Sequence, residues 1–372
     1  MAQLLSGLNW PLAYLILFVS ALLLSWRLTP AAGRLGRRFG LVDVPGGRKQ
    51  HRGPTPRSGG IALFATCWLV IGAAVAGGLL AGRLGDGGPV LAIARNMPRV
   101  LPQFGALALG AAWIFAVGLW DDRRPLRPIV KLGCQILAAA PLLLSGVQIV
   151  SFLPWQWLGG ALTVAWIVLL INSFNFLDNM DGLSAGVGAI VAAVLAWISW
   201  RADEYLMTAM FVTLAGALLG FLRHNFAPAR IFMGDSGSLF LGYMLAALTV
   251  RATYYKLGVP TRLPVLTPLI VLGVPLFDTC SVLWIRWREG RPLMQGDRNH
   301  FSHRLVDLGM TQRGAVVFIY LTTLCVALGA LLLRQLNLLG ALLVALQTVL
   351  WFVIIYSIER LGKRASANRA PR

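Results

Sequence analysis

Long apolar segments alternate with short polar segments along almost the whole of this 372-residue chain. A run of about 20 apolar residues is long enough to cross the hydrocarbon core of a bilayer as a helix. Eleven such runs occur, at residues 10–29, 59–82, 102–120, 132–150, 157–176, 183–200, 204–222, 232–250, 264–285, 314–333 and 336–358. The pattern predicts an all-α polytopic membrane protein with about eleven transmembrane helices.

The composition excludes a soluble globular protein, because 57% of the residues are hydrophobic and only 13% are charged. No internal repeat or appended soluble domain interrupts the pattern. We therefore expect one transmembrane catalytic domain over residues 1–360, followed at residues 361–372 by a short, basic, disordered cytoplasmic tail.

The basic residues predict the orientation, since cytoplasmic loops are enriched in Lys and Arg. With the N-terminus outside, 25 of the 33 Lys and Arg residues fall on the inner side, so the C-terminus is expected in the cytoplasm. The net charge of +19 is spread over short loops, which argues against nucleic acid as a partner. Most of these residues would orient the protein and attract anionic lipid, and the others would contact phosphate.

Acidic residues are rare, and their positions indicate chemistry. The chain has only 14 of them, yet six lie within or beside apolar runs, where charge is costly and usually functional. These are Asp121, Asp122, Asp178, Asp181, Asp235 and Asp278. A secondary transporter also buries carboxylates, but its sites usually lie near the bilayer midplane between related halves. Clustering at one surface favours an enzyme.

Asp121 and Asp122 end the third run, and Lys131 opens the fourth. A solvated ion-pair cluster with the arginines that follow is one interpretation. The second interpretation is that the two carboxylates lie beside a metal ion or that one of them acts as a base, because adjacent carboxylates otherwise repel each other. Lys131, on the same side, could contact a phosphate.

The segment NSFNFLDNMDGL has polar residues at every third position, which lie on one face if the helix persists. Inter-helical hydrogen bonds could explain Asn172 and Asn175, but the two carboxylates of Asp178 and Asp181 favour a functional stripe. Gly182 suits a turn after it.

The segment RIFMGDSGS places Asp235 in a glycine-flanked turn directly before an apolar helix. Ser236 or Ser238 could cap that helix, and a helix N-terminus favours phosphate. Asp235 would hold the accompanying cation, Mg²⁺ or in its place Mn²⁺, with Asn175 or Asp178 as further ligands.

Two other inner loops carry candidate substrate contacts. Lys49, Thr55 and Arg57 lie in the first loop, where a plain surface role is equally compatible with the sequence. The last loop gathers imidazole and guanidinium groups that could clamp a diphosphate. A zinc site is disfavoured, because no third nitrogen or sulfur ligand occurs at a suitable spacing. These groups belong to Arg298, His300, His303 and Arg304. Asp278 is a secondary candidate, because an internal helix contact explains it nearly as well.

The order and sequence of these loops over about residues 41–311 resemble the polyprenyl-phosphate N-acetylhexosamine-1-phosphate transferase family, also called glycosyltransferase family 4. The resemblance implies that Asp121 and Asp122 form an essential acidic pair. It also implies that Asn175, Asp178 and Asp181 line the active site and that Asp235 binds Mg²⁺.

The last loop separates branches of that family. Enzymes that use UDP-muramoyl-pentapeptide have three consecutive histidines followed by Phe-Glu, whereas this chain has HFSH. The loops are more similar to the branch that uses UDP-N-acetylglucosamine, although that branch usually has a further histidine where Ser302 or Arg304 stands.

The resemblance implies transfer of N-acetylglucosamine 1-phosphate from a UDP-sugar to undecaprenyl phosphate, with release of UMP, at the cytoplasmic face of a bacterial inner membrane. The product would start a lipid-linked envelope polysaccharide such as lipopolysaccharide antigen or a teichoic-acid linkage. Another UDP-N-acetylhexosamine or UDP-muramoyl-pentapeptide is the alternative donor. The lipid phosphate would attack directly, with Asp121 or Asp122 as base, and a two-step route through an aspartyl intermediate is the rival. Whether the chain works as a homodimer stays open.

Overall fold

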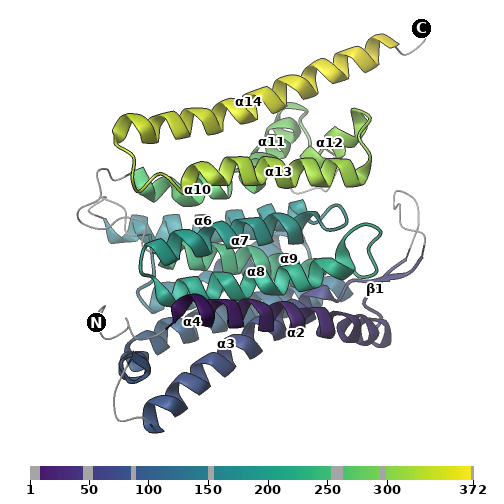
Figure 1. Cartoon of the computed structure of the whole chain (residues 1–372). Coiled ribbons are helices and arrows are strands. Elements are labelled where there is room, and N and C mark those ends of the chain that lie inside the picture. The colour runs from purple at the N-terminus through teal and green to yellow at the C-terminus, as the bar shows by residue number, and fades with distance from the viewer. Residues whose placement is uncertain are drawn as a thin grey trace.

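The protein is a bundle of long helices that run alongside one another (Figure 1). The computed structural model describes residues 9–44, 53–84, 89–149, 155–252, 263–293 and 299–369. The helices are α2 (Trp10–Arg38), α3 (Gly59–Leu84), α4 (Pro89–Arg123), α5 (Pro128–Leu144), α6 (Gln156–Leu177), α7 (Leu183–Arg201), α8 (Tyr205–Asn225), α9 (Gly234–Arg251), η1 (Leu263–Leu266), α10 (Thr267–Val271), α11 (Gly273–Arg288), α12 (Phe301–Asp307), α13 (Gln312–Ala330) and α14 (Leu338–Arg369). Two short strands, β1 (Val42–Asp43) and β2 (Thr55–Pro56), pair antiparallel with Val42 opposite Pro56.

The predicted all-α membrane architecture is confirmed, and each of the eleven apolar runs is helical over most of its length. Eight of the described helices are long and apolar enough to cross a membrane, and a bent pair gives a ninth. The helix α5 has only 17 residues, and α9 is not among the eight. The number of spans and the orientation of the termini therefore stay predictions.

The run at 264–285 was expected to form one helix, but the chain bends by 64° between α10 and α11. Pro275, near the start of α11, cannot donate a backbone hydrogen bond to the preceding turn, and its ring clashes with the carbonyl group there. Because of this bend, α11 runs in a different direction from α10, and polar side chains of α11 contact α12.

The C-terminal segment also differs from the prediction. Residues 361–372 were expected to form a disordered tail, but α14 continues as a helix to Arg369. This helix packs on α13 at the edge of the bundle, where Figure 1 shows it in yellow.

The helix α9 lies at the centre of the bundle and packs against α3, α4 and α6. Nearly all of its side chains are buried, from Ser236 to Thr249. Close approach of the α4 and α9 backbones depends on Gly118, where a Cβ atom would lie 2.5 Å from the Ser236 Cα atom. This contact fixes the ends of the two helices that carry Asp122 and Asp235.

We expect Gly118→Ala to destabilise the protein by about 1–3 kcal/mol, because the added methyl group must push the two backbones apart. The measurement is the apparent unfolding temperature in detergent. Gly105→Ala on the same helix is the control, since nothing lies within 4 Å of a Cβ atom there. Equal unfolding temperatures for the two variants would contradict the close packing of α4 on α9.

Candidate active site

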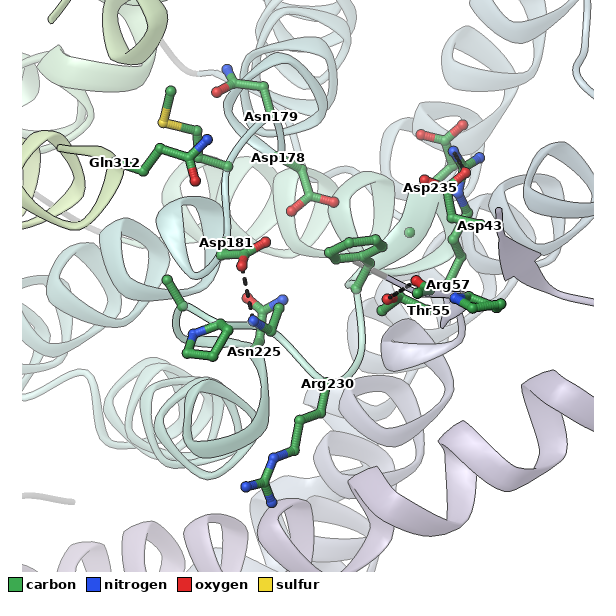
Figure 2. Close-up of a pocket in the computed structure, with 18 of the residues that line it drawn as sticks. Asp43, Thr55, Arg57, Asp178, Asn179, Asp181, Asn225, Arg230, Asp235 and Gln312 are labelled. Atoms are coloured by element: carbon green, nitrogen blue, oxygen red, sulfur yellow. Dashed lines mark hydrogen bonds and ion pairs between the residues drawn. The ribbon is translucent and has the colours of Figure 1, made fainter. Parts of the chain in front are cut away.

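One cavity of about 1150 Å³ opens where several helices end (Figure 2). It is lined by the last residues of α2, α4, α6 and α8 and by the first residues of α9 and α13, together with the β2 strand and α12. The predicted site residues that line it are Thr55, Arg57, Asp122, Asn175, Asp178, Asp181, Asp235 and His303. The structure thus brings together residues that are 248 positions apart in the chain.

Lys131 lies between two carboxylates, and one of them, Asp235, lines the cavity. The Lys131 Nζ atom is 2.6 Å from Asp121 and 3.1 Å from Asp235. Asp121 also accepts a hydrogen bond from the backbone N–H of Leu126 at 2.6 Å. Lys131 was predicted to contact a phosphate, but here its ammonium group neutralises carboxylates and joins α5 to the start of α9.

Asp122 holds the first turn of α9. Its two oxygen atoms accept the backbone N–H groups of Asp235 at 2.7 Å and of Ser236 at 2.9 Å. The prediction that Ser236 or Ser238 caps this helix is wrong, because the capping carboxylate comes from α4. Those two N–H groups are therefore not open to a phosphate, and the carboxylate lowers the electrostatic attraction of this helix end for an anion.

The two asparagines of the polar stripe face different partners. The Nδ2 atom of Asn175 donates to Asp235 at 2.5 Å and to Ser238 at 3.0 Å. Asn172 instead exchanges hydrogen bonds with the Gln135 amide on α5, at 2.7 and 3.3 Å, and does not line the cavity. Asn172 therefore joins two helices, as the alternative interpretation stated.

The helix α6 ends at Leu177, before the two aspartates of the NSFNFLDNMDGL segment. Asp178 is its C-cap residue, and Asp181 lies in the turn that Gly182 closes with a φ angle of +79°. One oxygen atom of Asp181 accepts the Ala229 N–H at 2.8 Å, which fixes the loop between α8 and α9. Figure 2 shows the side chains of Asp178 and Asp181 directed toward the same space.

Asp178 is the least satisfied of these acids. Within the described residues, no group donates a hydrogen bond to its carboxylate. Burial, and then the negative charges of Asp235 and Asp122, raise its pKa to about 8. A carboxylate surrounded by other carboxylates, with no donor of its own, is a place where a cation would relieve repulsion.

The donor set fits Mg²⁺ shared with a substrate better than a closed protein site. In the described part of the chain, no three His, Cys, Asp or Glu side chains converge as a metal site. Mg²⁺ usually takes one or two carboxylates and completes its shell with water and substrate phosphates. Asp178 and Asp235 could supply those carboxylates. Asn175 presents its amide nitrogen, and not its oxygen, to Asp235.

The cavity also has basic lining residues. Arg37, Arg57, Arg230 and Arg313 line it, together with His303. Arg57 is 2.6 Å from Asp43, and the Thr55 hydroxyl group donates to the Gly53 carbonyl at 3.1 Å. In Figure 2, Arg230 lies on the opposite side of the cavity from Asp178.

Besides Lys131 and Asn172, four further predicted substrate contacts are not among the described lining residues of the cavity. Lys49 and Arg298 lie outside the described residues. His300 and Arg304 are buried beside it, with 5% and 3% of their surface exposed, and both bind carboxylates. The secondary candidate Asp278 is one of those carboxylates, which agrees with the internal contact considered for it.

Sequence reasoning missed several lining residues, among them Arg37, Asn179, Asn225, Gln312 and Arg313. Arg37 belongs to a basic helix end whose sequence resembles the other Lys- and Arg-rich loops. Asn225 follows a long apolar helix and gave a weak signal, although its side chain bonds Gly182 and Ile231. Arg230 and Phe232 fall inside the RIFMGDSGS segment, which could have pointed to them.

Comparison with known proteins decides the family. The model of glycosyl transferase family 4 matches residues 104–253, which include the lining residues from Asp122 to Asp235. A probable undecaprenyl-phosphate N-acetylglucosaminyl 1-phosphate transferase of Bacillus subtilis is 31% identical over 354 residues, which is 93% of this chain and 92% of that protein. The chain belongs to this family.

Two further relatives show how far the likeness extends within the family. The decaprenyl-phosphate N-acetylglucosaminephosphotransferase of Mycobacterium tuberculosis is 35% identical over 87% of this chain and 83% of its own length. The undecaprenyl-phosphate alpha-N-acetylglucosaminyl 1-phosphate transferase of Salmonella typhi is 25% identical over 80% of this chain and 77% of its own. The family resemblance predicted from the polar loops is confirmed.

Two isosteric substitutions should have different effects on stability. Asp122→Asn removes one acceptor from the first turn of α9 and should cost about 1–3 kcal/mol. Asp178→Asn replaces a carboxyl group whose ionisation its neighbours oppose and to which no described residue donates, so the unfolding temperature should stay unchanged or rise. Both are measured in detergent without divalent cations. A larger loss in Asp178→Asn than in Asp122→Asn would contradict the site as described.

Proposed function

We propose that this protein transfers N-acetylglucosamine 1-phosphate from UDP-N-acetylglucosamine to undecaprenyl phosphate, releasing UMP, at the cytoplasmic face of a bacterial inner membrane. The observation that carries the proposal is the cavity where the helices end, which carboxylates and arginines line together. The relatives support it, because their names specify a polyprenyl phosphate and N-acetylglucosamine.

The reaction brings two anions together. An oxygen atom of the lipid phosphate attacks the β-phosphorus of the nucleotide sugar, and the bond from that phosphorus to the bridging oxygen breaks. UMP leaves with the electron pair of that bond. Such a transfer needs positioning and charge neutralisation, and it needs no protein nucleophile. The guanidinium groups of Arg37, Arg57, Arg230 and Arg313 line the cavity and can supply much of that positive charge.

The acidic pair is better placed to organise the site than to react. Both oxygen atoms of Asp122 accept backbone N–H groups, and Asp121 is bound to Lys131 and Leu126. A phosphate monoester loses its second proton near pH 6, so the lipid phosphate is mostly ionised at neutral pH and does not require either carboxylate as a base. Direct attack is therefore favoured over an intermediate on Asp121 or Asp122.

Asp178 and Asp235 are the residues that would hold Mg²⁺ in the cavity. When bound, the cation would neutralise charge on the diphosphate and on the leaving phosphate. Asn175 would orient Asp235, since its amide donates to the Asp235 carboxylate. Lys131, on the other oxygen of Asp235, would keep that carboxylate ionised and in place.

Purified protein in detergent, incubated with UDP-N-acetylglucosamine, undecaprenyl phosphate and Mg²⁺, should release UMP. Asp235→Ala should release none at any Mg²⁺ concentration, because the variant lacks a carboxylate that neither a higher metal concentration nor Lys131 replaces. The control is Asp307→Asn, which changes an exposed carboxylate that does not line the cavity. Full activity in Asp235→Ala would overturn the assignment of Asp235.

The same assay separates the alternatives. UMP release from UDP-muramoyl-pentapeptide or from another UDP-N-acetylhexosamine in preference to UDP-N-acetylglucosamine would replace the proposed donor. No UMP release from any donor, with uptake of a solute into vesicles that contain the protein, would favour a secondary transporter.

A further inference from the structure

The short helix α12 carries His303 into the cavity, whereas its N-cap residue His300 and Arg304, the residue after His303, do not line the cavity. These three residues belong to one helical turn, in which His303 lines the cavity and the other two side chains are buried. The partners of the buried residues show how this turn is held.

Asp278 on α11 binds the beginning of α12. One of its oxygen atoms accepts the Phe301 backbone N–H at 2.6 Å, and the other lies 2.9 Å from the His300 Nδ1 atom. Asp278 is fully buried, and it lies in the helix that the break before Gly273 redirects. The His300 ring also contacts Phe176 edge-on, with ring centroids 5.5 Å apart.

Glu359 on α14 binds α12 from another direction. Both of its oxygen atoms are 3.0 Å from the Arg304 Nε atom, and Glu359 is 4% exposed. The Nη2 atom of Arg304 donates to Ser281 on α11 at 3.0 Å, and Nη1 donates to the Asn299 carbonyl. Arg304 therefore ties α12 to α11, to α14 and to the loop before it.

A third contact joins α12 to the cavity itself. The Ser302 hydroxyl group donates to the Asn179 side chain at 2.6 Å, and Asn179 lines the cavity beside Asp178. The turn that carries His303 is thus fixed at three points by Asp278, Asn179 and Glu359. Two of these are buried carboxylates in a chain with only 14 acidic residues.

We propose that Asp278 and Glu359, neither of which touches the cavity, are positioning residues that hold α12 so that His303 faces the bound nucleotide sugar. The inference rests on the proposed function, in which the cavity binds UDP-N-acetylglucosamine. A consequence is that α14, which otherwise packs at the edge of the bundle, influences donor affinity through one ion pair. Groups outside a binding site commonly act in this way, by orienting the residues that make contact.

Glu359→Gln and Asp278→Asn keep shape and remove charge. Each should raise KM for UDP-N-acetylglucosamine on the order of tenfold, because a small displacement of a positioning turn weakens contacts made by its side chain. The value of kcat and the KM for undecaprenyl phosphate should stay within about twofold. Thr279→Val is the matched control, since it breaks a buried hydrogen bond to Ser173 next to Asp278 without touching α12.

The decisive comparison uses the His303→Ala background. If Glu359 acts through His303, adding Glu359→Gln to His303→Ala should change KM by less than about twofold. A tenfold rise in that background as well, or an equal rise in Thr279→Val, would show general destabilisation and overturn the proposal. Two separate carboxylates are tested, so failure of one variant to fold leaves the other to decide.

A readout without the reaction keeps the two proposals distinguishable. In a chain whose four cysteines are replaced by serine or alanine, His303→Cys is labelled with a water-soluble maleimide in membranes. Glu359→Gln and Asp278→Asn should change the labelling rate by roughly fivefold or more, whereas Thr279→Val should not. Equal rates in all four proteins would refute the positioning role. Absence of UMP release by the wild-type protein would refute the proposed function instead.

Discussion

The ammonium group of Lys131 sits between Asp121 and Asp235, 2.6 and 3.1 Å away, and the arrangement of the cavity depends on this contact. Carboxylates that end apolar helices would repel each other strongly if they shared a cavity without a cation. Lys131 neutralises two of them from the side, and Asp122 is satisfied by the backbone of α9. The third constraint is Gly118, which lets α4 approach α9 closely enough for both contacts to form.

With those carboxylates held, Asp178 is the lining acid that receives no hydrogen bond from a described residue. This is why the site suits a cation that arrives with its substrate: among the described residues too few carboxylates are free to bind a metal alone, and a diphosphate would supply the rest. The basic residues then have a separate task, since Arg37, Arg230 and Arg313 line the cavity and can bind the remaining phosphate charge. Two mutually repelling phosphates can approach only where both conditions hold.

The sequence predicted the helices and the membrane class because apolar length is a strong and local signal. It also predicted which acidic segments meet, because each lies at the end of an apolar run that the distribution of basic residues assigns to one side. The sequence could not predict which side chains form hydrogen bonds with one another. Asn172 and Asn175 share one helix face in the sequence, yet one binds Gln135 on α5 and the other binds Asp235 on α9. Which neighbour lies opposite each turn is a property of the packing.

The same limit explains the last loop. Its imidazole and guanidinium groups predicted a diphosphate clamp, but His300 and Arg304 bind Asp278 and Glu359, and only His303 among the described members of that set lines the cavity. Glu359 lies 55 residues beyond Arg304, in a segment with no other sign of chemistry. The break before Gly273 likewise depends on Pro275 acting within one helical turn, inside a run whose hydropathy is uninterrupted.

The most direct test of the central claim is Mn²⁺ binding, followed by electron paramagnetic resonance as UDP-N-acetylglucosamine is added. The account predicts that one Mn²⁺ binds tightly per chain only in the presence of the nucleotide sugar. It also predicts that Asp178→Asn and Asp235→Asn each abolish this binding. Tight Mn²⁺ binding without nucleotide, or nucleotide-dependent binding that survives in both variants, would contradict it.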